Sequence, residues 1–78
     1  MTKDLPVGVI EDLQNRFTYH VPKNDQPERY EWIRNEFLEL ALFLVHNCPQ
    51  SRELSVALTN LEQASMWANA SIARNEKE

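Results

Sequence analysis

The fold is decided by residues 54–73, which read LSVALTNLEQASMWANASIA. Apolar and small side chains recur there every three or four residues, a spacing that gathers them on one face of an α-helix. Glu62 is the only charged residue of the stretch, so the opposite face is small and neutral. This helix is either merely rich in alanine or, as we expect, covered on both sides by the rest of the chain and by a second copy. The apolar seam comprises Leu54, Leu58, Leu61, Ser65, Ala68 and Ile72.

Two long helices are expected. The one that contains the seam should begin at Ser51, whose hydroxyl is a good N-cap, and run to about Arg74 or Asn75. The other should begin near Gln26 or Pro27 with Asp25 as its N-cap, and end near Asn47. Together they predict an all-α fold, an antiparallel hairpin over residues 26–78. Its first helix should pack through Tyr30, Ile33, Phe37, Leu40, Ala41 and Leu44.

Residues 1–25 should form an N-terminal arm that precedes the hairpin. Within the arm, Val9 to Phe17 has enough helical pattern for one or two turns. Phe17 to Pro22 should be extended, because aromatic and β-branched residues there lead into a proline. The arm and the hairpin make a single small domain of 78 residues, and a domain this small often needs a partner for stability. We therefore expect a homo-oligomer.

Composition excludes several classes of protein. The net charge of −4 argues against a general DNA or RNA binder, and no apolar run reaches the roughly 20 residues that cross a membrane. Cys48 is the only cysteine, so no disulfide forms within the chain, and a free thiol without a signal peptide indicates a reducing cytosol. The few histidines and the single cysteine lack metal-site spacing, so we expect no metal and no cofactor.

Catalytic groups are poorly placed. Cys48 lies two residues from His46 but has no third group to orient the base, so we expect a partly buried structural thiol. The acidic pairs Glu28/Glu31 and Glu36/Glu39 fall on the solvent side of the first long helix, away from any apolar pocket. The sequence therefore predicts that the protein is not an enzyme.

Arginines and aromatic rings suggest a binding role. Arg34 interrupts the apolar surface of the first long helix, and Arg29 lies on the turn before it. Rings stack on bases and arginines bind phosphates, although such residues more often serve packing and surface charge. The remaining candidates are Arg52 and Arg74 at the two ends of the second long helix, and the arm rings Phe17, Tyr19 and His20.

Four segments carry a resemblance to a known family. They read RFTYHVPK (16–23), QPERYEWIR (26–34), CPQSRELSVAL (48–58) and MWANASIAR (66–74). Together, over roughly Asn15 to Glu76, they resemble the helical-hairpin domain shared by phage anti-CBASS and anti-Thoeris sponge proteins. The resemblance implies a hexamer of hairpins in the cytoplasm of the infected bacterial host. It also implies that the protein binds cyclic nucleotide messengers of bacterial immunity without cleaving them.

The resemblance also assigns roles to residues. Tyr19 and Arg34 match the aromatic and basic residues of a cyclic dinucleotide pocket between protomers. A cyclic trinucleotide pocket near a three-fold axis would use Arg52, Ser55 and Thr59, whereas Asn69 and Arg74 belong to the matched motif and serve either binding or structure. The alternative function is a helical protein–protein adaptor without nucleotide affinity.

Overall fold

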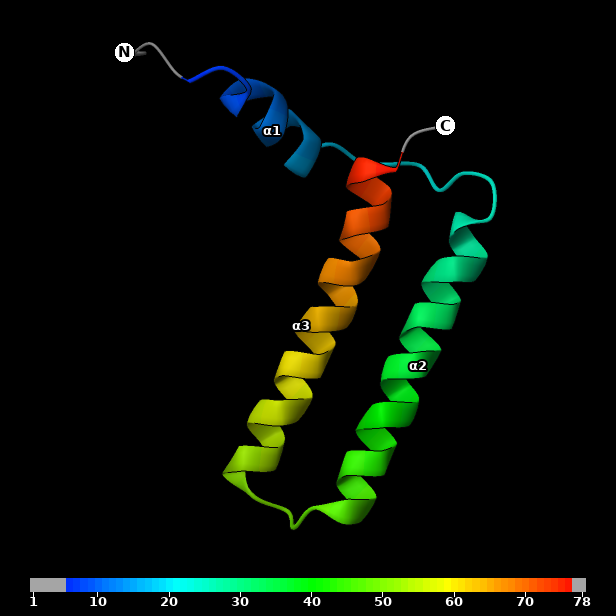
Figure 1. Ribbon diagram of the computed structural model, residues 1–78, viewed down its shortest axis with the longest axis vertical. Coiled ribbons are helices and arrows are strands. Elements are labelled where there is room, and N and C mark those ends of the chain that lie inside the picture. The colour runs from blue at the N-terminus through cyan, green and yellow to red at the C-terminus, as the bar shows by residue number, and fades with distance from the viewer. Residues whose placement is uncertain (1–5, 77–78) are drawn as a thin grey trace.

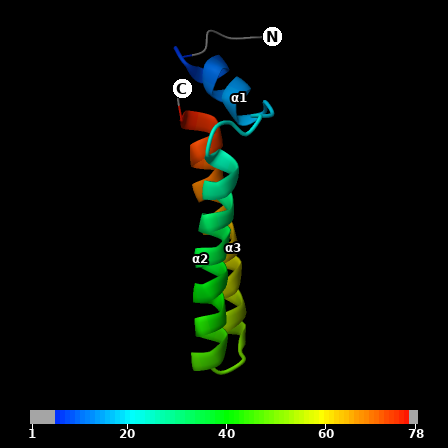
Figure 2. The same ribbon diagram turned by 90° about the vertical axis from the view of Figure 1, so that its right-hand side faces the viewer.

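The computed structural model describes residues 6–76, which form three α-helices and no strand. These helices are α1 (Val9–Arg16), α2 (Gln26–Asn47) and α3 (Arg52–Asn75). Helices α2 and α3 lie side by side and antiparallel, joined by a short connection at one end (Figures 1 and 2). The predicted hairpin and the predicted bounds of both long helices are therefore confirmed. We call the end with the short connection the closed end, and the end where α2 begins and α3 finishes the open end.

The predicted seam of α3 is confirmed, since all six of its residues are half-buried. On α2, five of the six predicted packing residues are half-buried as well, but Leu40 is exposed. Phe37, Ala41 and Leu44 follow one line along the helix, and Leu40 lies to one side of that line. There it borders a shallow outer hollow together with Glu36 and Phe37.

The two long helices begin with different caps. The backbone N–H of Leu54 donates to Oγ of Ser51 at 3.1 Å, which confirms Ser51 as the N-cap of α3. Asp25 occupies the N-cap position of α2, as predicted, but its side chain makes no cap hydrogen bond. Its carboxylate lies instead 3.1 Å from a guanidinium nitrogen of Arg29, one turn into the helix. At the start of α2, the backbone N–H of Gln26 donates to the carbonyl of Lys23 at 2.8 Å.

The arm lies beyond the open end of the hairpin. Helix α1 confirms the short helix expected there, and the connection after it crosses the open end to reach α2 (Figures 1 and 2). Residues 19–23 of this connection have no helical or strand structure. The arm therefore does not fold back along α2, which is the arrangement that would let Tyr19 reach Arg34 within one chain.

The hairpin is a single layer without an apolar core. The molecule measures 51 × 35 × 15 Å, and its thinnest dimension is little more than one helix diameter of about 10–12 Å. Within the described part of the chain no apolar side chain is buried. The accessible surface of 6644 Å² exceeds by roughly 1,700 Å² the value of about 4,900 Å² expected for a compact monomer of this mass.

Candidate functional site

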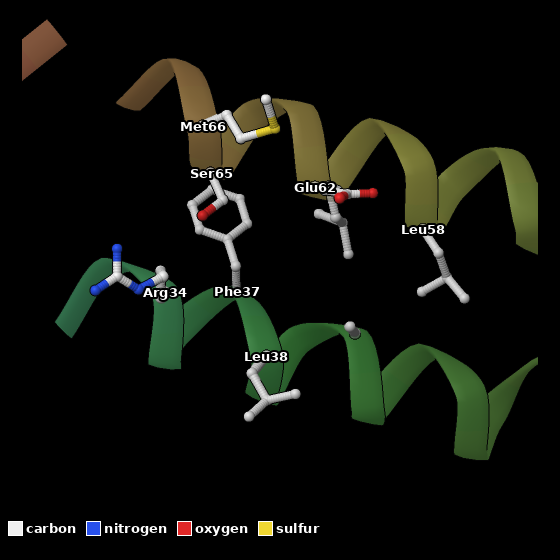
Figure 3. Close-up of a pocket in the computed structure, with 9 residues that line it drawn as sticks. Arg34, Phe37, Leu38, Leu58, Glu62, Ser65 and Met66 are labelled. Atoms are coloured by element: carbon white, nitrogen blue, oxygen red, sulfur yellow. The ribbon is translucent and has the colours of Figure 1, made fainter. Parts of the chain in front are cut away.

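A trough runs along one face of the hairpin between α2 and α3. It has a volume of about 520 Å³ and is lined mainly by apolar side chains. Its two charged groups are Arg34 on α2 and Glu62 on α3, and Figure 3 shows them pointing in opposite directions along the trough. Neither forms an ion pair with another residue of the described range 6–76. Arg34 is therefore a cation available to a ligand. Its neighbours in the trough include Phe37, Leu38, Leu58, Leu61, Ser65 and Met66.

Two of the three candidate rings of the arm are exposed. Phe17 is 85% exposed and Tyr19 is 79% exposed, and neither lines the trough. His20 has a structural contact, since its Nε2 lies 2.8 Å from the carbonyl oxygen of Asn15. A carbonyl oxygen only accepts, so Nε2 carries the proton and donates. His20 thus ties the connection to the end of α1, while Tyr19 stays free for stacking.

A cluster of polar side chains, which we call the clasp, joins the start of α2 to the end of α3 at the open end of the hairpin. Gln26 is 6% exposed, the one buried residue among those described, and its Nε2 donates to Oε1 of Glu76 at 2.8 Å. Its Oε1 accepts from the backbone N–H of Lys23 at 2.9 Å. Arg29 donates through Nη1 to Oε2 of Glu76 at 2.8 Å and through Nη2 to Oε1, a two-pronged ion pair. The clasp therefore joins the arm, the start of α2 and the end of α3.

The contacts of the clasp shift the pKa values of Glu76 and Arg29. The hydrogen bonds from Arg29 and then Gln26, opposed by partial desolvation, lower the pKa of Glu76 from its ordinary value to about 2. The same carboxylate raises the pKa of Arg29 above its ordinary value. Arg29 was a candidate for phosphate binding, but its guanidinium is held by Glu76 and Asp25. The guanidinium of Arg29 therefore has a structural role and is not free to bind a phosphate.

The trinucleotide candidates lie at the closed end, far from the arm. Arg52, Ser55 and Thr59 are exposed and follow one face of the first turns of α3. Ser55 borders a hollow of about 400 Å³ that extends from the connection to Leu58, next to the trough. Arg52 lies in the first turn, where free backbone N–H groups also attract anions. The three residues share this face because of their spacing on one helix, and their role in a trinucleotide pocket stays a prediction.

The last two candidates lie near the open end on α3. The guanidinium of Arg74 lies over the ring of Trp67, 5.6 Å from its centroid, beside a hollow of about 200 Å³. Oδ1 of Asn69 is buried without a hydrogen-bond partner, as are Nε of Arg29 and the hydroxyl of Tyr30. Arg74 is therefore occupied by a cation–π contact, and Asn69 has an unused acceptor.

Sequence reasoning missed Gln26 and Glu76. No local pattern marks them, because Gln26 lies next to an expected N-cap and Glu76 in a charged terminal segment. Their contact spans 50 residues and depends on the antiparallel packing of α2 and α3. The prediction of a partly buried Cys48 was also wrong, since its thiol is exposed.

Neither a metal site nor a membrane-spanning helix is present within residues 6–76. No cluster of three or more histidine, cysteine or acidic side chains has a geometry that would hold a metal ion. None of the described helices is long and apolar enough to span a bilayer.

Comparison with known proteins identifies the family. Residues 10–73 match the family model described as the Acb2/Tad1 hairpin domain. The match begins within α1 and ends two residues before the end of α3, so it covers most of the chain. Searches of the curated proteins and of the solved structures gave no match. The chain belongs to the Acb2/Tad1 hairpin-domain family of anti-CBASS and anti-Thoeris sponges, as its sequence motifs indicate.

Proposed function

We propose that this protein is a homo-oligomeric sponge, which binds cyclic oligonucleotide messengers and releases them unchanged. Binding would withhold the messenger from bacterial anti-phage effectors in the cytoplasm of the infected host. The observation that supports this most directly is Arg34, a cation without an ion-pair partner among the described residues, set in an apolar trough. An apolar cleft of about 300–1,000 Å³ with a few polar groups is typical of small-ligand sites.

The large surface of the single chain supports the proposed oligomerisation. A standard protein–protein interface buries about 800 Å² on each partner, so the excess surface of roughly 1,700 Å² corresponds to about two interfaces per protomer. Two interfaces per protomer allow a closed ring. Within this proposal the family resemblance favours a hexamer of hairpins.

A shared pocket also explains how an acidic protein binds phosphate. One trough offers a single guanidinium and holds a carboxylate, Glu62, which repels the phosphates of a cyclic dinucleotide. Packing two protomers together would bring two copies of Arg34 to one ligand. Since each Tyr19 lies outside its own trough, we propose that the stacking ring comes from the arm of a neighbouring protomer.

A second pocket for cyclic trinucleotides would use Arg52, Ser55 and Thr59. These residues share one face of α3 near its N-terminus, where the helix dipole favours anions. Several copies of this helix end around a symmetry axis would surround the phosphates with donors. This pocket lies at the closed end, so both ligands would bind without competition.

The experiment that tests the proposal is a bind-and-release assay. The purified protein is incubated with a cyclic dinucleotide, separated from free ligand, and heated, and the released nucleotide is analysed by chromatography. Intact ligand is the result expected for a sponge. Cleaved ligand would instead identify an enzyme, and failure to retain ligand would favour a protein–protein adaptor.

A further inference from the structure

The most buried residue of the described chain is polar and lies outside both proposed pockets. Gln26 is 6% exposed, whereas the apolar residues of the hairpin seam are only half-buried. Buried side-chain amides usually have hydrogen-bond partners for both the C=O and the NH₂ group. The carbonyl of the Gln26 side chain accepts from Lys23 in the arm, and its NH₂ group donates to Glu76 at the end of α3.

We propose that the clasp of Gln26, Arg29 and Glu76 positions the arm for ligand binding, so that Gln26 and Glu76 act on the ligand through Tyr19. This inference rests on the proposed sponge function. Tyr19 lies four residues before Lys23, whose backbone the clasp holds. Pro22 lies between them and restricts the backbone further. The clasp thus fixes the base of the segment that carries the exposed ring.

The geometry shows why these side chains are required together. Lys23 and Gln26 bond each other twice, since Gln26 N–H also donates to the carbonyl of Lys23 at 2.8 Å. Asn24, between them, adopts a left-handed backbone conformation with φ of 53°, which residues other than glycine seldom adopt. Glu76 orients the Gln26 amide by accepting from its Nε2, and Arg29 orients Glu76 with a two-pronged contact. Loss of any one partner therefore removes a bond that orients the next side chain of the clasp.

The arm has little other support. His20, which lies between Tyr19 and the clasp, donates to Asn15 and so anchors the connection to α1 rather than to the hairpin. Helix α1 itself has no buried residue. Within residues 6–76, the clasp bonds the connection to α2 and to Glu76 after α3, so it sets the position of Tyr19 relative to the hairpin.

The test compares three variants, each examined in two ways. Calorimetry measures the affinity for a cyclic dinucleotide, and NMR hydrogen exchange measures protection of the Lys23 amide. Gln26→Ala and Glu76→Ala should expose this amide and weaken binding by about tenfold, because affinity falls with the fraction of arms in place. Glu76→Gln retains an acceptor oxygen for Gln26, so it should weaken binding less than Glu76→Ala. Light scattering should show the same mass for all three.

Glu28→Gln is the matched control, since it removes the same charge from an exposed carboxylate on the first turn of α2. It should bind like the unchanged protein and keep the Lys23 amide protected. Full affinity in Gln26→Ala, with the Lys23 amide exposed, would overturn the positioning role while leaving the sponge function intact. Absence of binding by the unchanged protein would refute the sponge function itself, and the positioning role that rests on it.

Discussion

The arginines of this chain look alike in the sequence and differ in the structure. Arg29 is held by two carboxylates, and Arg74 lies over an indole ring. Arg34 has neither kind of contact with the described residues and lies beside apolar side chains. A guanidinium in such surroundings gains little from its position in the free protein, which makes it the strongest candidate for a ligand contact.

We predict that Arg34→Ala weakens cyclic dinucleotide binding while leaving the oligomer intact. A charge-assisted hydrogen bond contributes about 1.5–3 kcal/mol, so the affinity should fall by about ten- to a hundred-fold. Calorimetry measures this loss, and light scattering checks the mass. Arg52→Ala serves as the control, because Arg52 lies at the closed end and should not affect this ligand. An Arg34→Ala protein that dissociates would show that Arg34 is an interface ion pair instead.

Tyr30 is a second residue with a testable side chain, because of the environment of its hydroxyl. It is buried and has no hydrogen-bond partner within the single chain. An unsatisfied buried polar group costs about 1–3 kcal/mol, so Tyr30→Phe should leave the melting temperature unchanged or raise it. Thermal denaturation at fixed protein concentration measures the effect. A clear loss of stability would mean that a neighbouring protomer or a bound water satisfies this hydroxyl.

At the scale of elements, the two ends of the hairpin are held by different kinds of interaction. The closed end uses a local cap, in which Ser51 binds the N–H of Leu54 three residues later. The open end uses a long-range clasp, in which Gln26 and Arg29 of α2 bind Glu76 after α3. The first device forms within one helix, whereas the second forms only when the hairpin closes.

We predict that Ser51→Ala destabilises the protein by about 1 kcal/mol, the usual loss when an N-cap hydroxyl is removed. Urea denaturation at fixed protein concentration measures this free energy. Ser71→Ala is the matched control within the same helix, where alanine is the better helix former. If both substitutions had the same effect, the cap of Ser51 would contribute nothing to stability.

The clasp should be visible in the titration of Glu76. Its pKa is lowered to about 2, so the ion pair contributes fully above the ordinary carboxyl pKa of 4.5 and is lost as the pH falls through about 2. NMR of the side-chain carboxyl carbon of Glu76 should give a midpoint well below this ordinary value. Arg29→Ala should return the midpoint toward 4.5, because Arg29 is the largest cause of the shift. An unshifted midpoint in the unchanged protein would refute the clasp in solution.

At the scale of the whole molecule, the hairpin is too thin to bury its own apolar residues. Its radius of gyration is 17.2 Å, whereas a compact domain of this length has about 11–12 Å. Trp32 and Trp67 are each 64% exposed. Large apolar groups left in water on both long helices are typical of surfaces that bind other molecules, and the proposed oligomer would cover them.

We predict that Trp67→Asp dissociates or unfolds the assembly, whereas Trp67→Phe preserves it. An unpaired carboxylate buried in an interface costs several kcal/mol, comparable to the stability of a small domain. Sedimentation or light scattering at micromolar concentration gives the mass. A monomeric unchanged protein would contradict the oligomer, and an unchanged mass for Trp67→Asp would place this face of α3 outside the interfaces.

Local signals in the sequence predicted the helices well. The three-and-four spacing of apolar residues and the serine cap at residue 51 depend on interactions within a few residues, so they can be recognised without the fold. Leu40 was misassigned because its environment depends on the partner helix. Asp25 is the N-cap as predicted, but its carboxylate pairs with Arg29 instead of capping the backbone. Half-burial of the seam followed correctly from the pattern.

The candidate site was only partly predictable. Residue types suggested Tyr19 and Arg34, but the sequence does not give the path of the arm, and in the structure Tyr19 does not line the trough that contains Arg34. The helices, their seam and the family thus follow from the order of residues, because periodicity and short motifs are local. The trough and the Gln26–Glu76 clasp were decided by tertiary structure, because only the closed hairpin brings together side chains 50 residues apart.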